Sequence, residues 1–477
     1  MPKNPTLSAR AWALLLVLCG TIFLEGIDVA MLAVAVPSIR SDLGLSTGTA
    51  AWVMSAYVLG YAGFTLLGGR AADLLGRRRM FLTWLTVFML FSGLGGFATE
   101  GWMLITARFV TGVAAAFMTP AAMSIITTSY AEGPERNKAL LVFAGTAAGG
   151  FSLGLVIGGL LTALGWRWVF FAPVIFAGAV LLAAFKLLPA EGRPARATGG
   201  FDLAGAVVAA GAMLLLAFGI VRLEHGLDSW ELTAAAFAAG LLLTGLFVAV
   251  ERRAKNPLVR LGFLRKAATV RADLGMMLFV GAFFGFQFVV TLYLQELRGW
   301  SSFETALALI VMGVDAVLAP TLTPRLVNRF GNAKVAFGGF VLAAVTYVVF
   351  LQIGSDWTYA AMFPLLLLNG VAFAVVYGPL TIAATDGVDE EEQGLASGLL
   401  TTATQFGSAV GISAVTAVYG LSATSDPMDA FRAALAVPVA MILLGGLLTA
   451  TGLRTRPVRH MEAESPSAEP VRERQTV

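Results

Sequence analysis

The sequence has few of the residues from which disulfides, metal sites and hydrolytic centres are built. Cys19 is its only cysteine, which excludes an internal disulfide and a cysteine-based metal site. His225 and His460 are its only histidines, and they lie far apart in the chain. We therefore expect no metal site and no cofactor. The scarcity of histidine and cysteine also argues against an intramembrane hydrolase, which would need a Ser–His or zinc centre.

Charged residues are also scarce, at 13% of the chain against about 25% in an average soluble protein. No G-x-x-x-x-G-K-[ST] loop occurs, which argues against an ATP-driven pump. The net charge of +3 comes from basic residues in short loops beside apolar segments, so it does not indicate nucleic-acid binding. We expect a protein that is not an enzyme and binds no nucleic acid.

Long apolar runs dominate what is present, because 58% of the residues are hydrophobic. Fourteen runs of about 20 residues can each cross the hydrocarbon core of a bilayer as a helix. The sequence therefore predicts an all-α, polytopic membrane protein. The predicted spans are Trp12–Val36, Ala50–Gly69, Met80–Ala98, Trp102–Ser129, Ala139–Leu161, Trp168–Leu188, Leu203–Val221, Leu232–Val250, Ala272–Leu294, Ala306–Thr323, Val335–Ile353, Trp357–Leu380, Leu395–Tyr419 and Ala430–Leu453.

The basic residues orient these spans. With the N-terminus in the cytoplasm, the inside segments hold 26 of the 32 Lys and Arg residues and the outside loops hold five. This asymmetry predicts that both termini are cytoplasmic. The predicted organisation is an N-terminal six-helix half (1–190), an inserted helix pair (191–255), a C-terminal six-helix half (256–453) and a disordered cytoplasmic tail (454–477).

A glycine-rich basic segment, Gly69 to Arg78, connects the second and third spans. It resembles the G-x-x-x-D-x-x-G-R-[KR] signature of the major facilitator superfamily. Gly69 and Gly76 permit close backbone approach and a sharp turn. Asp73 is placed to pair with Arg77 or Arg78 and to accept from helix N-terminal amides, forming a latch that breaks when the halves rock. A plain orienting loop is the alternative.

A weaker echo of this segment, Pro324–Gly331, follows the tenth span at the corresponding place of the second half. Asn328 stands where an acid is expected, so a second latch should be weaker.

The fifth span carries Gly150, Gly154, Gly158 and Gly159 in a pattern similar to the G-x-x-x-G-P-x-x-G-G antiporter motif of drug exporters. Leu155 replaces the proline of that motif. Small residues at this spacing also let helices pack closely, so generic packing is the alternative.

The first span contains Ile27–Pro37, which resembles the L-D-x-T-I-V-N-V-A-L-P segment of drug:proton antiporters. Asp28 and Pro37 match, whereas Ala30 and Ala33 replace Thr and Asn. The chain is thus identified as a member of the fourteen-helix drug:proton antiporter family, which implies multidrug or antibiotic efflux across a bacterial cell membrane. Further segments similar to this group are Trp166–Phe170 and Gly394–Leu399.

Arg108 lies deep in the fourth span, where a guanidinium is costly and should face a cavity or an acid. Its segment resembles the R-x-x-Q-G-x-G-A-A motif, with Thr111 in place of Gln and Ala114 in place of Gly. The resemblance gives Arg108 a part in proton coupling. A purely structural buried charge is the alternative.

Glu25 and Asp28 are three residues apart, so they share a helix face deep in the first span. Two acids in a low-dielectric setting cannot easily both be charged, which predicts a carboxyl that loads and releases a proton. Glu25 is an extra acid that could instead bind a cationic substrate, and a structural pair with Arg108 is the alternative for both. Asp315 in the tenth span is either a second proton or cation site or a structural group.

The substrate cavity is expected near the midplane between the halves. The resemblance implies that the first and fourth helices of each half line it. Aromatic rings with a few polar groups there suit lipophilic or cationic compounds, although any single ring can instead face lipid or a neighbour. The candidate substrate-binding residues are Glu25, Phe283, Phe284, Gln287, Asn369, Phe373 and Tyr377.

The leading interpretation is a proton-coupled exporter of antibiotics or other small lipophilic compounds, working by alternating access. Its partners would be a small-molecule substrate, protons and the lipid bilayer, with the oligomeric state left open. A proton symporter for uptake of a small organic nutrient is the first alternative. A non-transporting membrane sensor is the second, and the charges at Glu25, Asp28 and Arg108 argue against it.

Overall fold

The computed structural model describes residues 8–188, 202–223, 230–254, 267–354, 357–422 and 427–453, together with 257, 259 and 262. Every regular element within these residues is helical, and none is a strand. The predicted tail, 454–477, and both histidines lie outside the described residues.

Each of the first eight predicted spans is a single helix. Most helices run past the predicted bounds at one or both ends, because polar and charged residues continue the helical backbone beyond the apolar run. The helices are α1 (Ala9–Leu43), α2 (Thr47–Leu75), α3 (Arg77–Gly96), α4 (Gly101–Ser129), α5 (Pro134–Leu164), α6 (Trp168–Leu187), α7 (Leu203–Arg222) and α8 (Trp230–Glu251).

The last six predicted spans also appear in order, with one of them broken into pieces. A π-helical turn, Tyr293–Leu297, extends α9, and a 3₁₀ turn, Glu390–Glu392, precedes α15. The helices are α9 (Ala267–Leu292), α10 (Ser302–Leu309), α11 (Asp315–Thr321), α12 (Thr323–Phe330), α13 (Asn332–Phe350), α14 (Tyr359–Thr385), α15 (Gln393–Ser422) and α16 (Pro427–Gly452).

The tenth span is not the single helix that its apolar run predicts. A 3₁₀ turn, Ile310–Val314, separates α10 from α11, and α12 follows as a further short helix. Pro320 lies inside α11 and Pro324 in the first turn of α12. Proline lacks a backbone donor and is tolerated in the first turn of a helix, so Pro324 accounts for the boundary between α11 and α12. The 3₁₀ turn itself contains no proline.

Within the described residues, twelve helices are long and apolar enough to cross a membrane. α2 and α15 are not among them, although they have 29 and 30 residues. Both are rich in Gly, Ala, Ser and Thr, which lowers hydropathy but lets helix backbones approach each other. These two helices pack against each other where the two halves of the bundle meet.

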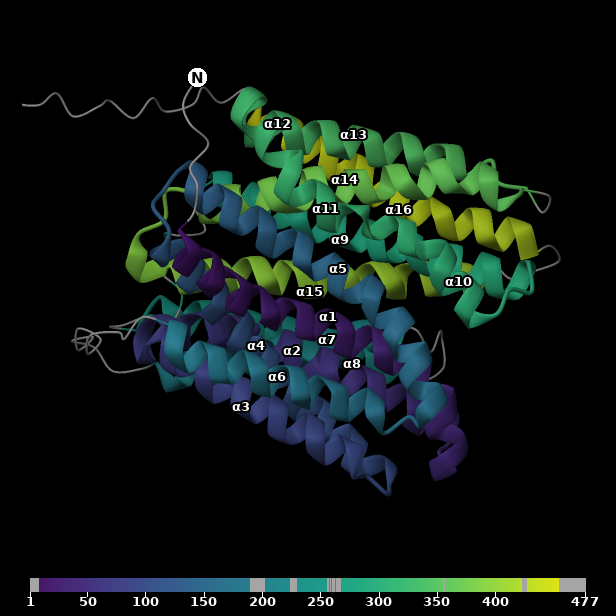
Figure 1. Cartoon of the computed structure of the whole chain (residues 1–477), viewed down its shortest axis with the longest axis horizontal. Helices are drawn as coiled ribbons and strands as arrows, with labels where there is room; N and C mark the ends of the chain where they lie inside the picture. Colours follow the sequence, from purple (N-terminus) through teal and green to yellow (C-terminus); the bar gives the residue numbers. More distant parts are fainter. Residues whose placement is uncertain are drawn as a thin grey trace, which may run out of the picture.

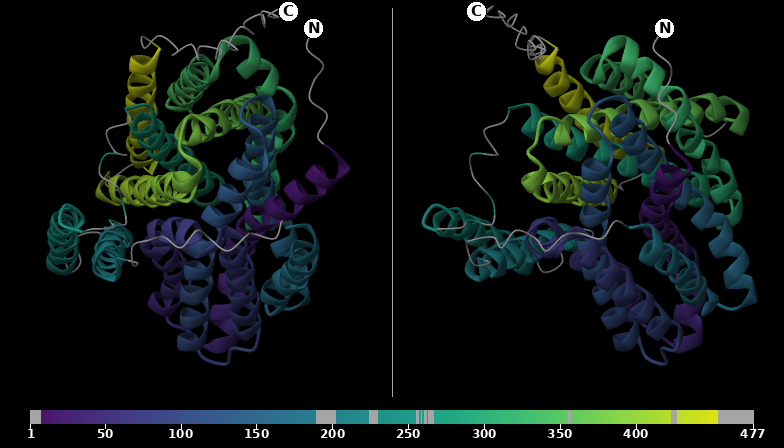
Figure 2. Two further views of the ribbon diagram at one scale, coloured as in Figure 1. Left: turned by 90° about the vertical axis from the view of Figure 1, so that its left-hand side faces the viewer. Right: turned by 60° about the vertical axis from the view of Figure 1, so that its left-hand side comes forward.

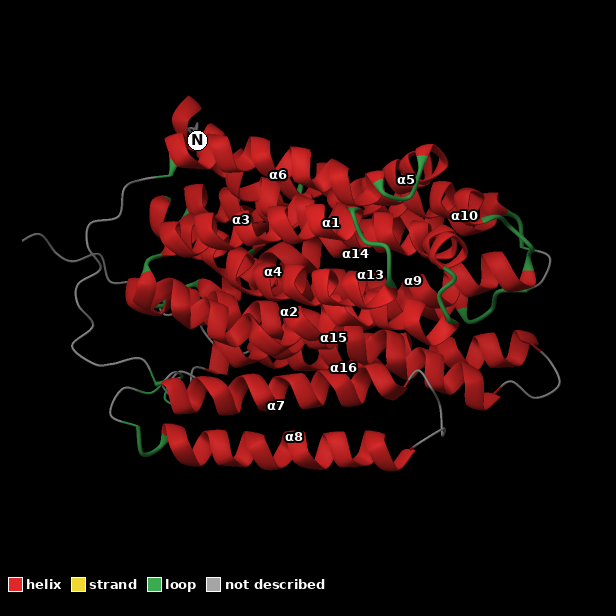
Figure 3. Cartoon of the chain, turned by 90° about the horizontal axis from the view of Figure 1, so that it is seen from below, coloured by secondary structure: helices red, strands yellow, loops and turns green. Residues whose placement is uncertain are grey.

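The helices form two layers of roughly parallel rods, with α1–α4 and α6 below and α9, α11–α14 and α16 above in Figure 1. α5 lies between the layers and contacts both α1 and α11. The pair α7 and α8 stands beside the bundle (Figure 2), and α7 packs on α2 and α15 (Figure 3). The middle pair is thus attached at the junction of the two layers.

Candidate functional site

Glu25 and Asp28 lie on one face of α1 and are buried, with 6% and 2% of their surface exposed. Asp28 forms an ion pair and a hydrogen bond with the guanidinium of Arg108 on α4. Arg108 is itself only 2% exposed. Removing one member of a buried pair leaves an uncompensated charge, so the two residues support each other.

Glu25 has neutral partners instead. The hydroxyl of Tyr61 on α2 donates to Oε2 of Glu25 at 2.8 Å, and the hydroxyl of Thr119 on α4 donates to Oε1. A hydroxyl can both donate and accept, so these partners can serve a charged or a protonated carboxyl. Glu25 can therefore change its protonation state without breaking an ion pair, whereas Asp28 cannot.

Tyr57 and Tyr61, one turn apart on α2, connect the two acids. The ring centroid of Tyr57 lies 4.4 Å from the guanidinium carbon of Arg108, a cation–π contact. The two tyrosine rings meet edge to face at 5.8 Å. Within the described part of the chain the Tyr57 hydroxyl has no hydrogen-bond partner, so its contribution comes from the ring.

The face of α1 that carries these acids is held by α5. A Cβ at Gly154 would lie 2.7 Å from Cα of Ile27, and one at Gly158 would lie 2.6 Å from Cα of Met31. Gly150 is equally tight against the carbonyl of Phe23, at 2.8 Å. These three predicted motif glycines therefore permit the α1–α5 contact.

Gly159, the fourth predicted motif glycine, does not take part in this contact. A Cβ at Gly159 would have Phe303 of α10 as its nearest neighbour, at 3.8 Å, which is an ordinary van der Waals distance. α5 runs unbroken through Leu155, where the related motif has proline.

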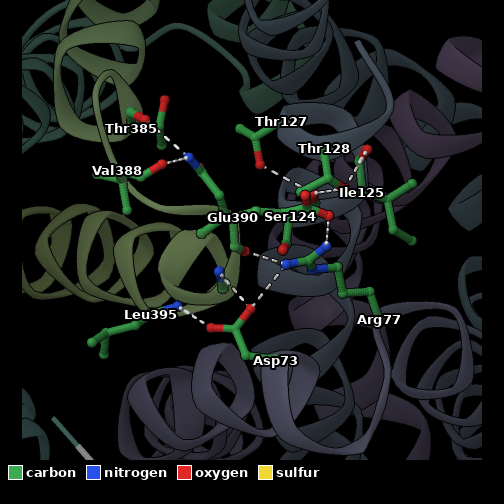
Figure 4. A network of polar contacts seen from close by, with 12 residues as sticks. Asp73, Arg77, Ser124, Ile125, Thr127, Thr128, Thr385, Val388, Glu390 and Leu395 are labelled. Carbon is green, nitrogen blue, oxygen red and sulfur yellow. Dashed lines mark hydrogen bonds and ion pairs between the residues drawn. The ribbon is translucent and has the colours of Figure 1, made fainter. Parts of the chain in front are cut away.

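The predicted latch joins α2 to the start of α15 (Figure 4). The carboxylate of Asp73 accepts hydrogen bonds from the backbone N–H groups of Gly394 at 2.9 Å and Leu395 at 3.0 Å. Helix N-terminal amides favour an anion, which makes this a natural seat for a carboxylate. A guanidinium nitrogen of Arg77 lies 3.5 Å from Oδ1 of Asp73, forming an ion pair. The same guanidinium also pairs with the carboxylate of Glu390, on the 3₁₀ turn before α15, and donates to the Glu390 backbone carbonyl.

The segment is more helical than a hinge-like loop. Gly69 to Leu75 belong to α2, Arg77 begins α3, and Gly76 alone is non-helical, with a φ of 97° that suits glycine. Arg78 donates to the carbonyl of Phe185 on α6, within its own half. The structure thus brings Gly69, Asp73 and Arg77 to the junction, and turns Arg78 toward α6.

Asp73 lies beyond the predicted end of its span, at the junction with α15. Burial raises the pKa of Asp73 from 3.8 to about 6, although Arg77 and the two backbone donors act in the opposite direction. This carboxyl therefore binds a proton more tightly when it is enclosed than when it is exposed to water.

Four of the predicted substrate-binding rings form a connected group. The centroid of Phe283 lies 4.6 Å from that of Phe373 and 5.5 Å from that of Phe284. Tyr377 stacks on Phe373 at 5.0 Å. Phe284 also meets Phe151 of α5 at 5.9 Å, so the group extends from α9 and α14 to the helix that holds α1.

The remaining predicted residues have other surroundings. Asn369 is fully buried, and its Oδ1 accepts from the hydroxyl of Tyr347 on α13 at 3.1 Å. Gln287 is half-buried, and its Oε1 has no hydrogen-bond partner among the described residues. Asp315 is fully buried at the start of α11, and neither of its carboxylate oxygens has a partner in the described part.

Sequence reasoning did not identify Tyr57, Tyr61 or Thr119. The available signal was the spacing of two tyrosines by four residues in the second predicted span. The described residues hold no group of three His, Cys, Asp or Glu side chains that could bind a metal ion.

Comparison with known proteins identifies the family. The family model described as Major Facilitator Superfamily matches residues 18–412 and, in a second match, 274–473. The chain belongs to the major facilitator superfamily. The predicted membership is thereby confirmed, and the shared fold accounts for the two layers of helices seen here.

Individual relatives of this superfamily member are antibiotic resistance and export proteins. The chain is 32% identical to the puromycin resistance protein pur8 of Streptomyces alboniger, over 98% of this chain and 95% of that protein. It is 32% identical to the cephamycin export protein CmcT of Amycolatopsis lactamdurans, over 94% and 95%. Like these bacterial relatives, it is a multi-pass protein of the cell membrane.

A solved structure shares the fold at lower identity. The human organic anion transporter MFSD10 matches with a TM-score of 0.67 and 16% identity, over 93% of this chain and 100% of that chain. This likeness supports the fold alone.

Proposed function

We propose that this superfamily member is a proton-coupled exporter of antibiotics or other small lipophilic compounds. The observation that carries the proposal is the buried group around Glu25 and Asp28, in which one carboxyl is paired with Arg108 and the other has hydroxyl partners only. The resistance and export roles named for the relatives support the direction of transport.

The proposed membrane arrangement has fourteen helices and both termini in the cytoplasm. α2 and α15 are added to the twelve apolar helices to give fourteen. Both are long enough to span a bilayer, and their mutual contact shields one face of each from lipid. We assign residues 1–190 and 256–453 to the two six-helix halves and 191–255 to the inserted pair.

In the proposed cycle, Glu25 is the residue that exchanges protons with bulk water. It takes a proton from outside when the site faces out, and it releases the proton inside after the halves rock. Because its partners are hydroxyls, this step leaves the Asp28–Arg108 pair intact. Asp28 takes part when a substrate or a second proton displaces Arg108.

The membrane potential can drive this cycle. Each proton that moves inward releases about 2.3 kcal/mol of free energy per 100 mV of membrane potential, in addition to the contribution of the pH gradient. Coupling requires that the protonated and deprotonated carboxyls favour different arrangements of the halves. The contact of Asp73 with the start of α15 is the proposed lock of the arrangement described here.

The proposed substrate region adjoins the acids. The connected rings of Phe283, Phe284, Phe373 and Tyr377 offer an apolar surface with cation–π capacity. Phe284 contacts Phe151 of α5, and the backbone nitrogen of Phe151 would lie 2.8 Å from a Cβ at Gly26, next to Glu25. A lipophilic cation bound on these rings would therefore compete directly with the proton on Glu25.

The test uses inverted membrane vesicles that contain the wild-type chain or Glu25→Gln. A gradient that is acid inside is built, a pH-sensitive dye records it, and a panel of lipophilic antibiotics is added. Export by antiport predicts that some compounds collapse the gradient with the wild type but not with Glu25→Gln. Gradient collapse of equal size in both proteins contradicts the proposal. Substrate movement in the same direction as the protons would instead indicate uptake by symport.

A further inference from the structure

A groove lies on the outer side of the C-terminal half, away from the acids of α1. Its volume is about 370 Å³, within the range of roughly 300–1,000 Å³ that is usual for ligand pockets. α12 and α13, which form two of its walls, lie along the upper edge of the molecule in Figure 1. The lining residues are Leu322, Leu326, Phe330, Lys334, Val335, Gly338, Gly339, Leu342, Val371 and Val375.

The groove is apolar except at one end. Lys334 is the only charged residue among its lining residues, and no acid lines it. Its floor is open at Gly338, where an added Cβ would meet nothing within 4 Å. The neighbouring Gly339 is closed, because a Cβ there would collide with Val376. The sequence therefore leaves a slot at Gly338 and fills the space beside it.

Positive charge gathers at the end of the groove where α12 meets α13. Arg325, Arg329 and Lys334 are all exposed, and none of them forms an ion pair within the described residues. The guanidinium carbon of Arg329 lies 5.2 Å from the ring centroid of Phe330, which lines the groove and is 48% exposed. An apolar slot thus ends directly at unpaired cations.

This end of the groove faces the same side of the membrane as the Asp73 contact, which the proposed topology places in the cytoplasm (Figure 1). Val341 and Val345, farther along α13, are 47% and 54% exposed, as expected of a helix that faces acyl chains. Anionic headgroups of the cytoplasmic leaflet attract Lys and Arg at this depth. The positive charge therefore suits an anionic headgroup, and the apolar slot suits the acyl chain of the same lipid molecule.

We propose that the groove binds an anionic phospholipid of the cytoplasmic leaflet, with one acyl chain along Gly338 and the headgroup phosphate against Arg329 and Lys334. The basic rim disfavours a cationic substrate, and none of the four rings of the proposed substrate region lines the groove. The site is therefore separate from the proposed transport path, although its orientation in the membrane rests on the proposed topology.

The test uses phosphatidylglycerol with a photoreactive group in one acyl chain. The full chain is purified, reconstituted in nanodiscs of phosphatidylcholine with a small fraction of the probe, irradiated, and mapped by mass spectrometry. Unlabelled phosphatidylglycerol or phosphatidylcholine is added as competitor. We expect labelling on α12 and α13 that phosphatidylglycerol displaces at least fivefold more effectively than phosphatidylcholine does.

Three variants make the test specific. Gly338→Leu fills the slot and should reduce labelling of this region at least fivefold, whereas Gly245→Leu, at an equally open and exposed position of α8, should leave it unchanged. The double variant R329Q/K334Q alters only exposed side chains, and it should remove the preference for phosphatidylglycerol while labelling persists.

Two results would overturn the proposal. One is equal competition by the two lipids with the wild type, which would mean non-selective contact with bulk lipid. The other is full labelling in Gly338→Leu. If Gly338→Leu fails to fold, the competition experiment with R329Q/K334Q decides the question, because retention of lipid preference there contradicts the proposal.

Discussion

Substitution of Gly69 should open the contact between α2 and α15. A Cβ at Gly69 would collide with the backbone carbonyl of Gly394 and would lie 2.8 Å from Cα of Gly398. Both neighbours are backbone atoms, so no side chain can turn aside to relieve the contact. Gly69→Ala is therefore expected to penalise the arrangement described here and to leave an arrangement with separated halves unstrained.

The size of the effect follows from the geometry. Inserting a methyl group into a closely packed contact costs about 1–3 kcal/mol. A shift of that size changes the ratio of separated to joined halves by about 5- to 150-fold. Gly398→Ala should have a smaller effect, because its Cβ would lie 3.1 Å from Cα of Gly69 and 3.2 Å from the carbonyl oxygen of Thr65.

Gly245→Ala is the matched control, since nothing lies within 4 Å of a Cβ at that position of α8. The gain in helix propensity, about 1 kcal/mol from Gly to Ala, is common to all three variants and to both arrangements, so it cancels. The order of effect should be Gly69→Ala, then Gly398→Ala, then Gly245→Ala.

The assay measures distances between spin labels at Arg79→Cys and Asp389→Cys, which are exposed positions on either side of the junction. The chain's single cysteine is removed by Cys19→Ala. Double electron–electron resonance in nanodiscs should show a longer-distance component that grows in the predicted order. A distance distribution in folded Gly69→Ala that coincides with that of Gly245→Ala would refute the reasoning.

Three further predictions concern side chains at the two polar contacts. Tyr57→Phe should keep a near-wild-type drug-driven proton flux, whereas Tyr57→Leu should lower that flux at least tenfold. The reason is that the ring contact with Arg108 is worth about 2 kcal/mol when desolvated. Equal fluxes in the two variants would contradict this. Glu25→Gln should weaken equilibrium binding of cationic compounds to the purified chain more than binding of neutral ones, and equal changes in the two affinities would exclude a ligand role for Glu25. The raised pKa of Asp73, about 6 against 3.8, means that the joined arrangement binds the proton more tightly. The stabilisation of the joined arrangement by this proton is fully present below about pH 4 and is lost as the pH rises through about 6. In the spin-label assay the short-distance component should therefore grow when the pH falls from 7.5 to 4.5, and it should grow less in Asp73→Asn.

The sequence predicts the helices well because their signal is simple. A run of about 20 apolar residues has few alternatives to a helix in a membrane. The pairing of Asp28 with Arg108 is one of the alternatives that the sequence leaves open, because a deep guanidinium should face either a cavity or an acid. The sequence also places Asp73 where it can accept from helix N-terminal amides, and its carboxylate accepts from the backbone N–H groups of Gly394 and Leu395. Its role as a latch stays a prediction.

Other features escape sequence reasoning for a physical reason. These helices are apolar on all sides, so the pattern does not say which face meets which neighbour. The sequence therefore does not indicate that Tyr61 and Thr119 meet at Glu25. It also does not indicate that Asn369 forms a hydrogen bond with Tyr347 of α13. The 3₁₀ turn that breaks the tenth span, Ile310–Val314, contains no proline and gives no sequence signal, and α11 beyond it packs on α5.

The most direct measurement of the central claim is drug movement in liposomes that contain only the purified chain and an imposed pH gradient. A radiolabelled compound that collapses the vesicle gradient is added outside liposomes that are acid inside. Proton-coupled antiport predicts that the compound accumulates inside above its external concentration, and that Glu25→Gln with Asp28→Asn abolishes accumulation. Equilibration to equal concentrations with the wild type, unaffected by the gradient, would contradict the account.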